Sequence, residues 1–246
     1  MTDQPFAPAT DLPTIVLVHG AFAESSSWNG VVERLHAAGL PVLAVANPLR
    51  GLAQDAQYLR SVIDHIDGPV VVAGHSYGGS VMGEATEGAA NVRALVYVAS
   101  FILEPGESTG ELAGKFPGGE LGTALTPAPY VAGPNSGDDL YIEQDKFRAV
   151  FAADVPEATA ALMAATQRPI ASAALEDAAS KAGWKAVPTW SMITLSDLAI
   201  PAESMRFMSA RAESHTVEIE ASHAVTVSQP GAVAEFILEA VRETNR

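Results

Sequence analysis

The chain has 246 residues, a formal net charge of −15 and no cysteine. Its length fits one domain, or one domain that carries a lid, since domains usually contain about 100–200 residues. Hydrophobic residues make up 48% of the chain and charged residues only 17%, which excludes a disordered protein.

The charge and the missing cysteines narrow the possible partners and cofactors. An acidic surface does not attract nucleic acid or an anionic membrane, so we expect a small-molecule partner and neither of those two; the oligomeric state stays open. Without cysteine there is no disulfide framework, thiolate zinc site or cysteine nucleophile. The start of the chain has no basic segment followed by an apolar one, so we expect a cytoplasmic protein.

Short apolar runs alternate with amphipathic stretches along most of the chain. The apolar runs predict strands at residues 15–18, 41–46, 70–73, 94–99, 189–195 and 216–219. The amphipathic stretches predict helices at residues 28–38, 51–66, 77–88, 201–212 and 229–243. Continuous apolar strands separated by helices indicate an α/β fold, with about six mostly parallel strands and helices on both faces.

The alternation is interrupted between residues 101 and 186, where Gly, Pro, Ala and acidic residues are frequent. We expect an irregular piece at 105–139 and helical stretches near 141–151 and 156–182. A structureless loop of this length is uncommon in a compact domain unless it is functional. We therefore predict a core domain made of residues 1–100 and 187–246, with residues 101–186 inserted as a lid.

The third predicted strand runs into the sequence Gly74-His-Ser-Tyr-Gly78, a G-x-S-x-G motif that is followed by a helix. In that context the motif predicts a sharp turn that presents the hydroxyl of Ser76 above the sheet, where a nucleophile would stand. The plainer interpretation is a glycine-rich turn with a serine cap. The first strand also ends in a bend, at His19-Gly20-Ala21, and we predict that the N–H groups of Ala21 and Tyr77 form an oxyanion hole.

A serine nucleophile needs a base, and the base needs an acid to orient it. His223 follows the last strand and Asp197 follows the strand before it, so both lie at the sheet edge where Ser76 is expected. The other five histidines lie on helices, at the start of a strand or in loops, and are poorer candidates for the base. The acids that compete with Asp197 lie in the predicted lid: Asp154, Glu176 and Asp177.

With these motifs the chain resembles the α/β-hydrolase superfamily, from about Ile15 to Val241. Within it the chain is most similar to small bacterial esterases and to the plant branch of methylesterases and hydroxynitrile lyases. The lyases carry a threonine after the histidine of the first loop and a lysine beside the catalytic histidine. This sequence has Gly20 and Ala224 there, which favours ester hydrolysis over cyanohydrin cleavage.

The resemblance implies a serine esterase that works without a cofactor, and the sequence contains no dinucleotide, Walker or metal-binding motif. The lid would roof an apolar pocket for a small or medium, mostly uncharged ester. The following residues are predicted to line it: Phe22, Phe101, Ile102, Leu103, Tyr130 and Trp184. A lactonase, amidase, carbon–carbon bond hydrolase, perhydrolase or lyase on the same scaffold stays open, as does a non-catalytic small-molecule receptor.

Overall fold

The computed structural model describes residues 12–131 and 136–244. A six-stranded sheet runs through the centre in the order β2-β1-β3-β4-β8-β9, and every neighbouring pair is parallel. This confirms the predicted sheet. Its strands are β1 (Thr14–Val18), β2 (Val42–Val45), β3 (Val70–Ser76), β4 (Val92–Ser100), β8 (Thr189–Thr194) and β9 (His215–Ile219).

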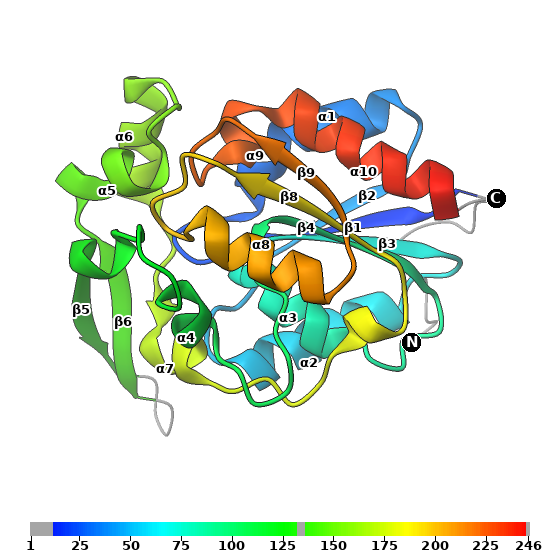
Figure 1. The fold of residues 1–246 in the computed structure, drawn as a ribbon, viewed down its shortest axis with the longest axis horizontal. Helices are drawn as coiled ribbons and strands as arrows, with labels where there is room; N and C mark the ends of the chain where they lie inside the picture. Colours follow the sequence, from blue (N-terminus) through cyan, green and yellow to red (C-terminus); the bar gives the residue numbers. More distant parts are fainter. Residues whose placement is uncertain (1–11, 132–135, 245–246) are drawn as a thin grey trace.

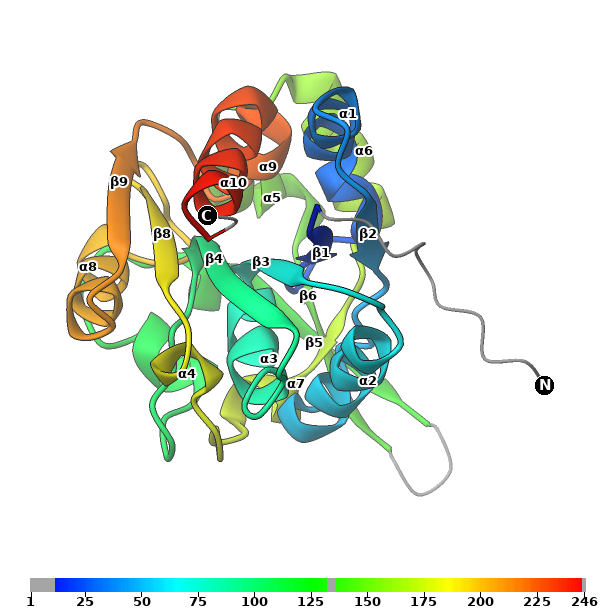
Figure 2. The ribbon, with the colours of Figure 1, turned by 90° about the vertical axis from the view of Figure 1, so that its right-hand side faces the viewer.

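Helices cover both faces of this sheet (Figures 1 and 2). One face carries η1 (Ser25–Trp28), α1 (Asn29–Ala37), α9 (Val225–Ser228) and α10 (Pro230–Thr244). The other face carries α2 (Leu52–Asp64), α3 (Tyr77–Ala85) and α8 (Ala202–Arg211). None of the helices in the described part of the chain combines the length and the hydrophobicity that a membrane span requires.

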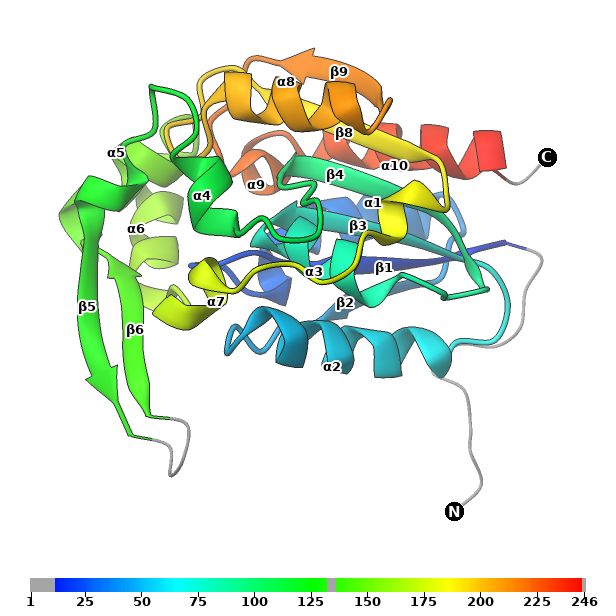
Figure 3. The ribbon, with the colours of Figure 1, turned by 60° about the horizontal axis from the view of Figure 1, so that its bottom comes forward.

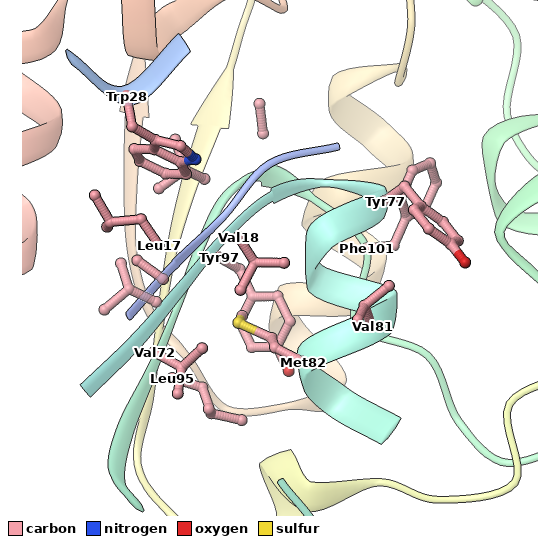
Figure 4. Packing of buried hydrophobic residues seen from close by; sticks show 14 of the residues in the cluster. Leu17, Val18, Trp28, Val72, Tyr77, Val81, Met82, Leu95, Tyr97 and Phe101 are labelled. Carbon is pink, nitrogen blue, oxygen red and sulfur yellow. The ribbon is translucent and has the colours of Figure 1, made fainter. Parts of the chain in front are cut away.

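The central strands β1 and β3 are buried along their whole length. Successive side chains of a strand point to opposite faces of the sheet, and helices cover both faces. Figure 4 shows Leu17 on the side of Trp28, while its neighbour Val18 lies on the side of Met82 and Tyr97. A strand that must fill two apolar layers reads as a continuous run of Val, Ile and Leu, which is why these strands could be predicted from the sequence.

Most of the segment between β4 and β8 lies beyond the carboxyl ends of the strands, whereas its last residues, 183–185, lie beside the C-terminal end of α3 (Figures 1 and 3). Its elements are α4 (Thr109–Ala113), η2 (Leu121–Ala124), β5 (Leu125–Tyr130), β6 (Gly137–Ile142), α5 (Gln144–Phe151), α6 (Glu157–Thr166), β7 (Ile170–Ala171), α7 (Ser172–Glu176) and η4 (Gly183–Lys185). We use the name lid for residues 101–186 throughout.

Two expectations for the lid were wrong. The segment expected to be irregular contains most of an antiparallel sheet, in the order β5-β6-β7. Pro127 and Pro129 hide β5 from sequence analysis, but a proline is tolerated in an edge strand, where its missing N–H costs no ladder bond. The helical stretch expected to reach residue 182 ends with α6 at Thr166, before Pro169, since a proline disfavours helical geometry in the residue that precedes it.

Candidate active site

Ser76 stands at the turn between β3 and α3, in a strained backbone conformation. Its φ is 55° and its ψ −128°, a region that costs a residue with a side chain on the order of 1–3 kcal/mol. The turn is possible because the flanking positions are glycine. A Cβ atom on Gly74 would lie 2.8 Å from backbone atoms of Gly78, and one on Gly78 would collide with the carbonyl oxygen of Val18.

The first loop approaches this turn closely. A Cβ atom on Gly20 would lie 2.6 Å from Cβ of Ser76. Buried His19 shapes the loop: its Nε2 accepts the N–H of Asn47 at 3.0 Å, and its Nδ1–H then donates to the carbonyl of Gly20 at 2.8 Å. Burial lowers the pKa of His19 to about 4, so the ring is neutral and this tautomer persists at neutral pH.

Asp197 and His223 form a buried pair. The Nδ1 atom of His223 lies 2.7 Å from Oδ2 of Asp197, and both side chains are almost fully excluded from solvent. Asp197 also accepts the hydroxyl of Thr194 at 2.7 Å and the N–H groups of Ala199 and Ile200 at 2.8 Å each. Four hydrogen bonds therefore hold this carboxylate in one orientation.

His75 reaches the same histidine from the other side. Its Nε2–H donates to the backbone carbonyl of His223 at 2.8 Å, and the two rings lie 4.7 Å apart. Burial, with His223 as a second cause, lowers the pKa of His75 to about 3, so it stays neutral. Nothing in the sequence pattern indicated this contact, because it joins residues 148 positions apart.

Tyr77, the first residue of α3, is fixed by its own hydroxyl. The hydroxyl donates to Oδ2 of buried Asp55 at 2.9 Å, and the carboxylate of Asp55 also accepts the N–H of Arg50 at 3.0 and 3.2 Å. Burial raises the pKa of both Tyr77 and Asp55. The first turn of α3, whose N–H groups point toward Ser76, is thus tied to the core.

One pocket is lined by Ser76, Tyr77 and His223 together with residues of the lid. It has a volume of about 410 Å³, open solvent at its mouth included. The core contributes Ala21, Phe22, Ser76, Tyr77, Ala199, Ile200 and His223, and the lid contributes Phe101, Thr109, Gly110, Ala113, Leu121, Phe151 and Leu175. None of these lining side chains carries a carboxylate, ammonium or guanidinium group.

The structure does not bring four of the residues predicted for the lining to this pocket. Ile102 and Leu103 are buried away from the pocket; the N–H of Ile102 lies 3.2 Å from Sδ of Met208 in α8. Trp184 is buried elsewhere, donating from Nε1 to the carbonyl of Leu103 at 2.8 Å. Tyr130 lies on the outer hairpin under the guanidinium of Arg50, 5.0 Å from the ring centroid.

Two of the three competing lid acids have other partners. Asp177 accepts the N–H of Leu52 at 2.9 Å, and Asp154 accepts the hydroxyl of Ser222. Among residues 12–131 and 136–244, no group of three or more His, Asp or Glu side chains is arranged to hold a metal ion. The arrangement around Ser76 is thus a hydroxyl and an Asp–His pair facing an uncharged pocket, which suits acyl transfer by a serine nucleophile.

Comparison with known proteins assigns the fold to a family. The sequence profile of the alpha/beta hydrolase family matches residues 15–236, most of the chain. The chain belongs to this family. A curated relative, the alpha/beta hydrolase nvfD of Aspergillus novofumigatus, is 26% identical in an alignment of 256 positions that covers 94% of this chain and 97% of that protein.

Solved structures of this family share the fold over nearly the whole chain. Polyneuridine aldehyde esterase superimposes with a TM-score of 0.80 at 21% identity, covering 93% of this chain and 98% of that one. The methylesterase MES16 from Arabidopsis gives a TM-score of 0.78 at 19% identity, covering 94% of this chain and 100% of that one. A pyrethroid hydrolase from Sphingobium faniae gives a TM-score of 0.76 at 19% identity, covering 94% of this chain and 97% of that one. The protein is an α/β-hydrolase with the fold of plant methylesterases.

Proposed function

We propose that the protein is a serine esterase that cleaves small or medium, mostly uncharged carboxylic esters through an acyl-enzyme on Ser76. The observation that carries the proposal is the buried pair of Asp197 and His223, 2.7 Å apart, whose histidine lines the same pocket as the strained Ser76. A base oriented by a fixed carboxylate beside a serine is the arrangement that activates a hydroxyl at neutral pH.

In this mechanism Asp197 holds the Nδ1–H of His223, which leaves Nε2 to take the proton of Ser76. The serine oxygen bonds to the ester carbonyl carbon, and the tetrahedral intermediate collapses as His223 returns the proton to the departing alcohol. Water then attacks the acyl-enzyme with the same base, releasing the acid and restoring Ser76. Asp197 stabilises the imidazolium cation and does not take the proton.

The oxyanion of each intermediate would bind to the N–H groups of Ala21 and Tyr77. Both residues line the pocket next to Ser76, and both are placed by polar anchors: His19 shapes the first loop, and Asp55 ties down the side chain of Tyr77. Preorganised donors of this kind can contribute about 3–4 kcal/mol each to transition-state stabilisation.

The pocket supports an uncharged substrate of small or medium size. Its walls are aromatic and aliphatic side chains from core and lid, and a hydrocarbon group gains from leaving water there, whereas a charged one would lose its hydration without a partner. Several proteins of the same fold carry names of ester-cleaving enzymes, among them the polyneuridine aldehyde esterase and the methylesterase.

The test is hydrolysis of p-nitrophenyl acetate, butyrate and octanoate by the wild type, Ser76→Ala and a matched control, Ser61→Ala. Ser61 lies on the exposed surface of α2, and its hydroxyl binds only within its own helix, to the carbonyl of Tyr58. We expect Ser76→Ala to lose at least about 10³-fold in kcat while the control keeps wild-type rates. An inert wild type would favour a lactonase, carbon–carbon hydrolase, lyase or receptor; an active Ser76→Ala would refute the nucleophile.

A further inference from the structure

The loop that carries His223 is bonded to the lid as well as to the core. The N–H of Ala224 donates to the carbonyl of Phe151 at 2.9 Å. The hydroxyl of buried Ser222 donates to the carboxylate of Asp154. The residues on both sides of His223 are thus held by one short lid segment, residues 151–154, which joins the end of α5 to α6.

The aromatic ring of Phe151 packs against the base itself. Its centroid lies 4.8 Å from that of His223 with an interplanar angle of 71°, an edge-to-face arrangement that fixes ring orientation. The same ring meets Phe22 at 6.3 Å and lines the pocket. One lid residue therefore contacts the base, the first loop and the space where the substrate would lie.

The segment is itself braced. The guanidinium of Arg148, in the last turn of α5, donates to the carbonyl of Ala153 at 3.2 Å and to that of Val155 at 3.4 Å. These bonds close the turn that presents Asp154 to Ser222. A turn held by these two bonds transmits the position of α5 to the loop that carries His223.

We propose that residues 151–154 act as a latch through which the lid positions His223, and that Asp154 is a positioning residue for catalysis. His75 holds the carbonyl of His223 from the core, and the latch holds Ser222 and Ala224 from the lid. The base is then aligned for proton transfer only while the lid is seated. This inference rests on the proposed function, because the alignment matters for acylation of Ser76.

The test compares Asp154→Ala, Asp154→Asn and Ser222→Ala with the control Glu157→Ala, an exposed acid in the first turn of α6. Asp154→Ala and Ser222→Ala should each lower kcat for p-nitrophenyl acetate about fivefold and leave KM within twofold, since the latch acts on the base and not on the ester. Asp154→Asn keeps an acceptor oxygen and should retain most of the rate. The double variant should lose no more than either single one.

Hydrogen exchange supplies a readout that does not need turnover. Peptides covering residues 221–228 should exchange faster in Asp154→Ala than in the wild type and stay unchanged in Glu157→Ala. If the wild type hydrolyses no ester but exchange changes as expected, the proposed function fails and the latch stands. Unchanged exchange, additive losses in the double variant, or a loss carried by KM alone would overturn the latch.

Discussion

The turn around Ser76 in the core and the lid build two walls of one pocket in different ways. On the core side the backbone is packed with no free space: Gly20, Gly74 and Gly78 each lie where a single Cβ atom would collide. On the lid side, a Cβ atom on Gly122 would meet no other atom within 4 Å, and the lining is made of apolar side chains. The core leaves no room for another atom beside Ser76, whereas apolar side chains of the lid set the size of the pocket.

The polar groups of the core and of the lid differ in the same way. Asp197 is held by four hydrogen bonds, and His75 and His19 are buried neutral, all at the ends of core strands. In the lid, residues 101–186 contain no histidine at all. The comparison teaches that changes on the core side should abolish the chemistry, while changes to lid side chains at the pocket wall, outside residues 151–154, should shift substrate preference.

The largest effect on activity is expected from a change of Asp197, the buried acid of the core. Asp197→Ala removes the partner of the Nδ1–H of His223 and leaves three buried donors without an acceptor, so we expect kcat for p-nitrophenyl acetate to fall about 10³–10⁴-fold. Steady-state kinetics with Asp177→Ala as a control would measure it, since Asp177 binds the N-terminus of α2 instead. Similar losses in both variants would break the distinction between core and lid.

A single methyl group tests the packing of the turn around Ser76. Gly78→Ala places Cβ against the carbonyl oxygen of Val18, a backbone atom that cannot rotate away, whereas Gly122→Ala in the lid adds a methyl group to open space. We expect the first change to cost on the order of 3 kcal/mol of unfolding free energy and most of the activity, and the second to cost almost nothing. Urea unfolding of both variants measures this; equal midpoints would refute the packing argument.

Acid should destabilise the protein through the core histidines. Burial holds the pKa of His75 at about 3 and that of His19 at about 4, while in the unfolded chain both protonate near pH 6.5. Below that pH the unfolded state binds more protons, so the free energy of unfolding should fall between pH 6.5 and 5, by on the order of 1 kcal/mol per pH unit for each histidine.

Urea midpoints at pH 7.5, 6.5, 5.5 and 5.0 measure this slope. In His75→Gln, which cannot titrate, the slope should be smaller by about half. A slope that is unchanged in this variant would show that the loss of stability arises from other groups.

The smallest expected effect is a change of preference. Leu175→Ala shortens a lid side chain at the pocket wall and leaves the catalytic groups in place. The ratio of kcat/KM for octanoate to that for acetate should rise about fivefold, since one or two methylenes of pocket space are worth about 1–3 kcal/mol. A fall in activity on all three esters with no change in their ratio would contradict a purely spatial role for Leu175.

Sequence analysis could predict the core because the hydrophobic pattern of its strands and helices is regular. Strands buried on both faces read as unbroken apolar runs, and strand ends converge, so Ser76, Asp197 and His223 could be placed at one edge from the sequence alone. The same reasoning placed Phe22 and Phe101 at the pocket, where both lie.

The sequence of the lid has no such regular hydrophobic pattern. Pro127 and Pro129 concealed an edge strand, and Trp184 and Leu103, expected at the pocket, instead bind each other away from it. The contacts of His75 with His223 and of Phe151 with Ala224 join distant parts of the chain through backbone carbonyls. Every residue has a backbone carbonyl, so no sequence motif indicates which one accepts such a bond.

The central claim, a covalent acyl-enzyme on Ser76, is tested most directly by rapid acid quench of the enzyme during turnover of p-nitrophenyl acetate, followed by mass spectrometry of the intact and digested protein. The account predicts one acetyl group per chain, located on the peptide that contains Ser76 and absent from Ser76→Ala. Turnover without an acetyl group on that peptide, or with the group on another residue, would contradict it.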